Sequence, residues 1–370
     1  SGSNAPVIMP ERLAKTDPFT QVTEMVGSGP YKFVANERVP GSLVVYERNP
    51  DYVPRSNGRP SFTAGPKIVH FDRVEWHVIP DAATAAAALQ SGEMDWWETP
   101  TADLLPLLHR DRQITIEIQD PTGDLGCMRP NFLYPPFDNV AFRRALMGAV
   151  DQRAFMTAAA GTDPTLSHVP AGVFCPVSPL ASDAGMPKLV GEPDYAAVRR
   201  AIAASGYKGE KIVVLGATDF PIIDAACNVG LDMLKKAGLH VDYVATDWGT
   251  LVERRGNKAP PENGGWNVFF TYWGGLDMFS PAADASIRGN GDAGWFGWPK
   301  FPDRERLREA WFASQDLPTQ KKIASEIQVQ FFKDVPFYPL GQLFNPIAYR
   351  DGVSGILDGG FVLFWNVHKS

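Results

Sequence analysis

The apolar positions of the first 125 residues alternate over short stretches, a pattern typical of β-strands. An alanine-rich stretch interrupts them: residues 82–91 favour a helix, with Asp81 as its N-cap and Gly92 as its end. A short helix is also expected from Thr101 to Leu108. This part of the chain is therefore predicted to be rich in strands, which are expected at 31–34, 42–48, 71–79 and 114–118.

From about residue 126 to residue 340, helical and strand patterns alternate, which favours a mixed α/β lobe. Apolar residues at helical spacing from Asn139 to Met156 predict one long amphipathic helix. The residues after 340 are expected to form a short extended tail. If this tail rejoins the first lobe, the chain forms two lobes connected by two crossings. The other helices are expected at 195–204, 222–236, 307–313 and 319–332, and the strands at 211–215, 240–245 and 337–340.

Length and composition fit a globular protein of two or more packed domains. The 370 residues are roughly twice a domain of ~150 residues, with 44% hydrophobic and 21% charged residues. The net charge of −7 argues against a nucleic-acid binder, which needs a basic face. No window approaches the ~18 consecutive apolar residues of a membrane span. Residues 1–5 have neither the charged nor the apolar region of a signal peptide, so none is expected in this chain.

The cysteines and histidines predict neither a metal site nor a disulfide framework. Cys127, Cys175 and Cys227 are widely spaced and form no C-x-x-C, so buried thiols are expected and one disulfide is the upper limit. The six histidines form no H-x-x-x-H pair, and the chain holds neither a G-x-S-x-G elbow nor a P-loop. We therefore expect no metal, no cofactor and no catalytic residues, although a catalytic set can be assembled from distant positions.

Residues 266–298 combine aromatic rings with glycine and suggest a binding surface. Glycine permits close approach, and the rings offer a large contact area with few rotamers. Trp273 is the leading candidate for stacking on a solute, with Tyr272 and Phe279 beside it; the alternative is that the rings of this segment are core. An even spread would put about one of the ten tryptophans in this segment, which holds Trp266, Trp273, Trp295 and Trp298.

Seven short motifs follow one another along the chain from residue 27 to residue 340. They are Gly27–Phe33 with Glu47–Tyr52, Ile79–Asp81 with Leu89–Asp95, Pro135–Asn139 with Arg143–Leu146 and Ala149–Asp151, Ala203–Tyr207, Lys236–Val241, Asp247-Trp248, and Val335–Leu340. Each motif alone occurs widely, but their order is specific. Together they resemble the family 5 extracellular solute-binding proteins of ABC transporters, the dipeptide, oligopeptide and nickel-binding group.

The resemblance implies an α/β protein with the two-lobed, class II architecture of periplasmic binding proteins and with mixed sheets. Lobe I is expected at 1–125 and is β-rich, lobe II at 126–339 is α/β, and a tail at 340–370 returns to lobe I. Full-length members carry an N-terminal stretch and a small extra domain before the motif that begins here at Gly27. The resemblance therefore implies that the first lobe is incomplete and the extra domain missing, and it makes the missing N-terminal part a candidate partner.

The resemblance also implies a function without chemistry. A periplasmic member captures a small solute, peptide-like by family default, in an aromatic-lined cleft between its lobes and delivers it to a membrane ABC permease. Members also take nickel chelates, sugars and opines, so the solute stays open, and no nucleic-acid partner is expected. The alternative is a hydrolase or other enzyme that uses the cleft, which no nucleophile–base motif in this sequence supports.

Further candidate residues come from the family pattern. In peptide-binding members an aspartate shortly after a tryptophan pairs with the amino group of the peptide, which points to Asp277 after Trp273. The spacing here is one residue longer than the usual pattern, so a solvated loop carboxylate is the alternative. Trp96 and Trp97 lie in a segment that the family places near the lobe interface. Their rings face opposite sides of an extended chain, so only one ring is expected to point into the cleft.

Arg129 and Asn131 are candidates in the strand expected to cross between the lobes. Because side chains alternate along a strand, the two residues share a face. Arg129 could form a fork onto a solute carboxylate, and a structural salt bridge is the alternative. Trp248 is expected to pack within the second lobe.

Overall fold

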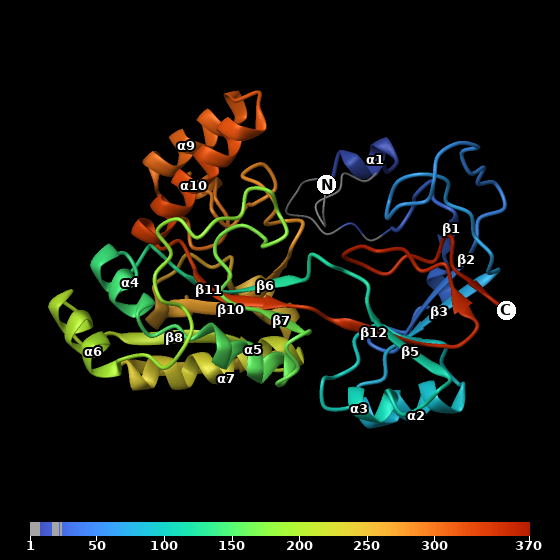
Figure 1. The fold of residues 1–370 in the computed structure, drawn as a ribbon, viewed down its shortest axis with the longest axis horizontal. Coiled ribbons are helices and arrows are strands. Elements are labelled where there is room, and N and C mark those ends of the chain that lie inside the picture. Colours follow the sequence, from blue (N-terminus) through green and yellow to red (C-terminus); the bar gives the residue numbers. More distant parts are fainter. Residues whose placement is uncertain (1–7, 17–21, 23) are drawn as a thin grey trace. The chain divides into compact units, whose positions relative to one another are not determined.

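The computed structural model describes residues 8–16, 22 and 24–370, which form two compact units (Figure 1). Unit 1 comprises residues 122–344; unit 2 comprises the described residues up to 121 together with 345–370. The sequence predicted lobe boundaries at 125/126 and 339/340, and the structure divides into its two units at 121/122 and 344/345. The expectation about a signal peptide concerns residues 1–5, which lie outside the described residues.

A six-stranded mixed sheet runs through unit 1 in the order β7-β11-β6-β10-β8-β9. Strands β10, β8 and β9 run parallel to one another, whereas β6 is antiparallel to both of its neighbours. Strand β8 is a nearly continuous run of buried apolar residues, as expected for a strand covered on both faces. The strands are β6 (Asp124–Pro130), β7 (Ser167–His168), β8 (Lys211–Ala217), β9 (His240–Thr246), β10 (Val268–Gly274) and β11 (Tyr338–Leu343).

Helices cover both faces of this sheet (Figure 1). Two of them, α5 and α7, pack against each other and against the strands, while α9 and α10 form a second pair on the opposite side. Phe331 of α10 packs into a buried apolar cluster with Cys127 of β6. The helices are α4 (Val140–Met147), α5 (Gln152–Ala160), α6 (Tyr195–Ala204), α7 (Pro221–Lys236), α8 (Trp248–Arg254), α9 (Pro302–Ala313) and α10 (Leu317–Asp334).

The single long helix predicted from Asn139 to Met156 is wrong, because the chain forms α4 and α5 there. Asp151 has an extended backbone and its carboxylate accepts from the backbone N–H of Arg153 at 3.1 Å, so it is the N-cap of α5. It also accepts from Gly191 N at 2.9 Å. A capping aspartate offers the backbone an alternative to continuing the helix, and the amphipathic pattern does not reveal that competition.

Unit 2 contains two three-stranded sheets, β1-β2-β3 and β4-β12-β5, together with a short pair of strands. Helix α2 begins and ends as predicted: Asp81 accepts from Thr84 N at 2.7 Å, and Gly92 ends the helix with a φ of 82°. The elements are α1 (Glu11–Ala14), β1 (Tyr31–Phe33), β2 (Leu43–Arg48), β3 (Arg73–His77), α2 (Ala82–Ser91), β4 (Trp96–Trp97), α3 (Leu105–Leu108), β5 (Ile114–Ile118), β12 (Pro346–Arg350), β13 (Val353–Ser354) and β14 (His368–Lys369).

The three cysteines are buried and free, as the sequence predicted. Burial raises the pKa of the Cys127 and Cys227 thiols to about 12, so both remain protonated at neutral pH. In the part of the chain that the structure describes, no group of three or more His, Cys, Asp or Glu side chains is arranged to hold a metal ion. No described helix has both the length and the apolar character needed to cross a membrane.

Candidate functional site

The carboxyl ends of the parallel strands β8, β9 and β10 meet at one edge of the sheet in unit 1. After β8 the chain proceeds to β9, whereas after β10 it proceeds to β11, on the other side of the sheet. Adjacent strands β8 and β10 therefore form a topological switch point. In open α/β sheets, ligands bind outside the carboxyl ends of strands at such a point. This edge is the candidate site.

An aromatic residue lies at or just after the end of each of the three strands at this edge. Phe220 lies after β8 and is 47% exposed, Trp248 lies after β9, and Trp273 lies near the end of β10. The rings of Phe220 and Trp248 are 6.0 Å apart. Trp248 N donates to Asp219 Oδ1 at 2.8 Å, which ties the start of α8 to the end of β8. The edge thus carries one exposed ring, Phe220, and two half-buried rings, Trp248 and Trp273.

Trp295 joins this edge from the segment before α9. Its ring lies 4.7 Å from Trp273 in an edge-to-face arrangement and 5.5 Å from Phe269. Trp273 and Trp295 are half-buried, whereas other rings of the 266–298 segment are core. The alternative that the rings of this segment are core therefore holds for some residues and not for others. The fully buried rings are Trp266, Phe269 and Phe270.

Of the other candidates near Trp273, Tyr272 and Phe279 are also half-buried and Asp277 is buried. Burial raises the pKa of Tyr272 above its usual range, and its hydroxyl has no hydrogen-bond partner among the described residues. Phe279 packs against the apolar cluster that contains Cys127. Asp277 is only 4% exposed, and its N–H donates to Gly274 O at 2.9 Å. The alternative of a solvated loop carboxylate at Asp277 is therefore wrong.

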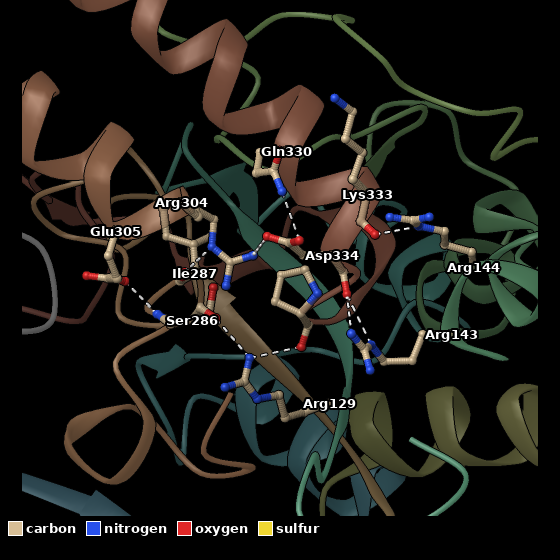
Figure 2. Close-up of polar contacts among 12 residues, drawn as sticks. Arg129, Arg143, Arg144, Ser286, Ile287, Arg304, Glu305, Gln330, Lys333 and Asp334 are labelled. Atoms are coloured by element: carbon tan, nitrogen blue, oxygen red, sulfur yellow. Dashed lines mark hydrogen bonds and ion pairs between the residues drawn. The ribbon is translucent and has the colours of Figure 1, made fainter. Parts of the chain in front are cut away.

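Arg129 is fully buried in β6 and binds backbone carbonyl groups (Figure 2). Its Nε donates to Phe296 O at 2.7 Å, and its Nη1 donates to Ser286 O at 2.8 Å and Pro336 O at 3.0 Å. Burial lowers its pKa to about 9. No ion pair of Arg129 occurs among the described residues, so carbonyl contacts take the place of the structural salt bridge named as the alternative. Arg129 holds the segment that carries Trp295 against the sheet.

Asn131, which the sequence placed on the same strand face as Arg129, is also fully buried. Its Nδ2 donates to Trp266 O at 3.0 Å, and its Oδ1 accepts from Leu133 N at 3.0 Å. These contacts give Asn131 a structural role at the end of β6.

Further charged residues lie around Arg129 and complete what we call the arginine network, which comprises Arg129, Arg143, Arg304, Asp284 and Asp334. Figure 2 shows the three arginines and Asp334. Arg304 Nη1 lies 3.3 Å from Asp334 Oδ2, and Arg143 donates twice to Asp334 O. Burial raises the pKa of Asp284 to about 6, although its carboxylate accepts from Ser286 N and Oγ. The network ties the end of α10 and the segment before α9 to β6.

Trp96 and Trp97 lie in unit 2 and line a cavity of about 610 Å³. The Trp96 ring lies 6.0 Å from Phe364, and its indole nitrogen is buried without a hydrogen-bond partner among the described residues. Glu98 lines the same cavity, and burial raises its pKa. The eight candidates therefore divide between the units, with six in unit 1 and these two tryptophans in unit 2. Their part in solute binding stays a prediction.

One residue at the candidate site was not identified from the sequence. Arg255 follows α8, and its guanidinium is surrounded by four aromatic rings that we call the Arg255 cage. No motif or period distinguishes this arginine from its neighbour Arg254, because the rings come from three separate segments. The distances from its Cζ to the ring centroids are 4.5 Å for Phe296, 5.5 Å for Trp248, 5.7 Å for Trp295 and 5.9 Å for Phe269.

Comparison with known proteins identifies the class to which this fold belongs. The solved structure of the periplasmic binding protein DppA from Helicobacter pylori, in complex with the peptide STSA, covers 93% of the chain with a TM-score of 0.73 and 18% identity. NikA from Staphylococcus aureus, in complex with Ni(L-His)2, covers 96% with a TM-score of 0.73 and 15% identity. The α/β periplasmic-binding-protein architecture predicted from the sequence is confirmed.

The chain belongs to the bacterial extracellular solute-binding proteins, family 5, whose middle region matches residues 3–294. It is 37% identical over 369 residues to the probable peptide ABC transporter periplasmic-binding protein y4tO of Sinorhizobium fredii. Members of this family are extracellular or periplasmic binding proteins of transporters. The chain spans 69% of the y4tO protein, 63% of the H. pylori structure and 72% of the NikA structure.

Proposed function

We propose that this chain is the periplasmic solute-binding component of an ABC importer and that it captures a small peptide-like solute for a membrane permease. The observation that carries the proposal is the 37% identity, over 99% of the chain, to a probable peptide ABC transporter periplasmic-binding protein. The half-buried rings at the carboxyl edge of unit 1 support it, because apolar surface with a few polar groups is typical of ligand sites. The role requires binding and release and no chemical step.

Native mass spectrometry of the purified protein tests the central claim. We expect a co-purifying small molecule that leaves the protein unmodified when it is released. Conversion of that molecule on incubation with the protein would instead support the alternative of a hydrolase or other enzyme.

A thermal-shift screen addresses the class of solute. Ligands that bind only the native state raise the unfolding temperature, and the rise grows with ligand concentration above the Kd. We expect di- to pentapeptides to raise it more than oligosaccharides or nickel–histidine complexes at equal concentration. A shift confined to oligosaccharides or to nickel–histidine would contradict the peptide assignment.

A further inference from the structure

Arg255 is a half-buried cation whose cage shares the Trp248 and Trp295 rings with the candidate site. Its guanidinium lies within 6 Å of the centroids of four aromatic rings, closest to Phe296 at 4.5 Å. The faces of aromatic rings attract a cation, so the cage positions the guanidinium without neutralising it. A positive charge held in this way is expected to pair with an anion.

No such anion is found among the described residues. Arg255 Nε is buried without a hydrogen-bond partner there, and no described carboxylate lies within ion-pair distance of the guanidinium. The adjacent Arg254 differs, because its Nε and Nη2 donate to the carbonyls of Gly264 and Gly265, each at 3.2 Å. Burial lowers the pKa of Arg255 to about 10, which still leaves it protonated at neutral pH. Arg255 is thus a charged donor with unused capacity.

The nearby acidic groups already bind elsewhere. Asp247 caps α8 by accepting from the backbone and hydroxyl of Thr250, and Asp219 accepts from Trp248 N. The Asp292 carboxylate pairs with Lys258 at 2.7 Å. Among the described residues, no ion pair gives Arg255 a counter-ion, and these three carboxylates are engaged elsewhere.

We infer that Arg255 binds a carboxylate group of the captured solute. The guanidinium is a planar fork that matches the two oxygens of a carboxylate, and the surrounding rings can contact the apolar atoms next to it. The inference rests on the proposed function, because the carboxylate belongs to a peptide-like solute. Arg129 is unsuited to this role, since it is fully buried and already donates to three carbonyls.

A matched pair of small probes tests the inference on the 370-residue chain. Hippurate carries an aromatic ring, an amide and a free carboxylate, and hippuramide differs only in that the carboxylate is an uncharged amide. We expect calorimetric titration to show binding of hippurate at least tenfold tighter than binding of hippuramide. Arg255→Gln should abolish that difference, and Arg255→Lys, which keeps the charge but not the fork, should retain part of it.

Arg200→Gln is the matched control, because Arg200 is exposed on α6 and its loss removes the same charge from the chain. Circular dichroism confirms that each variant is folded. Equal binding of the two probes to the native chain, binding of neither, or hippurate binding that survives Arg255→Gln and falls with Arg200→Gln would each overturn the inference. None of these results affects the native mass spectrometry or the thermal-shift screen, so the proposed function stands or falls separately.

Discussion

Arg129 and Arg255 each place a guanidinium near the Trp295 ring, with Cζ 5.0 Å and 5.7 Å from its centroid. The Arg129 side chain is fully buried and donates to three backbone carbonyls, whereas the Arg255 side chain is half-buried and donates to none of the described residues. The same ring therefore borders a cation committed to the fold and a cation left available. The three carbonyl contacts of Arg129 stabilise the fold even though its Nη2 is buried without a partner among the described residues, whereas the Arg255 side chain makes no such contact and is held by aromatic rings.

The acidic residues make the same distinction. Asp284 and Asp334 lie within the arginine network, where Arg304 acts on the pKa of both. The Arg255 cage contains four rings and no described carboxylate. The network places two aspartates among three arginines, with an ion pair between Arg304 and Asp334, whereas the cage holds no described carboxylate. The following experiments separate the two regions, from the largest expected effect to the smallest.

Arg129→Met should destabilise the fold most. The variant leaves the carbonyls of Phe296, Ser286 and Pro336 without their donors, and each unsatisfied buried acceptor costs about 1–2 kcal/mol. We expect the free energy of unfolding, measured by urea denaturation, to fall by about 3–5 kcal/mol. A loss below about 1 kcal/mol would show that the network does not depend on Arg129.

Asp284→Asn should change how stability depends on pH. The folded state raises the pKa of Asp284 from its ordinary 3.8 to about 6, chiefly because burial disfavours the charged form. Its contribution is therefore present in full below pH 3.8 and is lost as pH rises through about 6, a change of up to about 3 kcal/mol.

Urea denaturation of both proteins at several values between pH 4 and pH 7 measures this effect. The unfolding free energy of Asp284→Asn should rise relative to that of the native protein across this range. Two curves that stay parallel would contradict the assignment of a raised pKa to Asp284.

Trp273→Ala should weaken binding of the solute by at least ~1 kcal/mol, the low end for a ring stacked on a ligand. Calorimetry with the strongest ligand from the thermal-shift screen measures the change. Trp311→Ala is the control, because Trp311 packs partly buried against the same apolar cluster as Trp273 but lies in α9. Equal affinities of the two variants would remove Trp273 from the site.

Arg255→Met should change stability least. The substitution removes cation–π contacts worth about 0.5–1 kcal/mol and also relieves the cost of a buried Nε without a partner. We expect the unfolding free energy to stay within ~1 kcal/mol of the native value. A loss as large as that of Arg129→Met would mean that Arg255 also serves the fold and would erase the contrast between the two regions.

The sequence predicted most local elements because their signals are local. Asp81 and Gly92 mark the two ends of α2, and the helix 195–204 and the strand 114–118 were predicted to the residue. The break between α4 and α5 escaped prediction because the cap at Asp151 competes with an otherwise helical pattern. Strand β10 was not predicted, since its aromatic residues were interpreted as a binding surface.

The site could be predicted only in part. Trp273 was found because aromatic residues are dense in its segment, and the structure places it at the switch-point edge. The carbonyl partners of Arg129 come from residues 286, 296 and 336, and the rings around Arg255 come from positions between 248 and 296. The carbonyl contacts of Arg129 and the ring contacts of Arg255 both come from residues distant in sequence, and no local pattern encodes them.

The position of β12 has a consequence for how the chain is made. Residues 122–344 separate β5 from β12, yet β12 is the central strand between β4 and β5. Chains generally begin to fold during synthesis, starting from the N-terminal end. On the ribosome, β4 and β5 are made early but lack their shared neighbour until residues 346–350 emerge. By then all of unit 1 has been synthesised. The β4-β12-β5 sheet of unit 2 can therefore be completed only after unit 1 has been made.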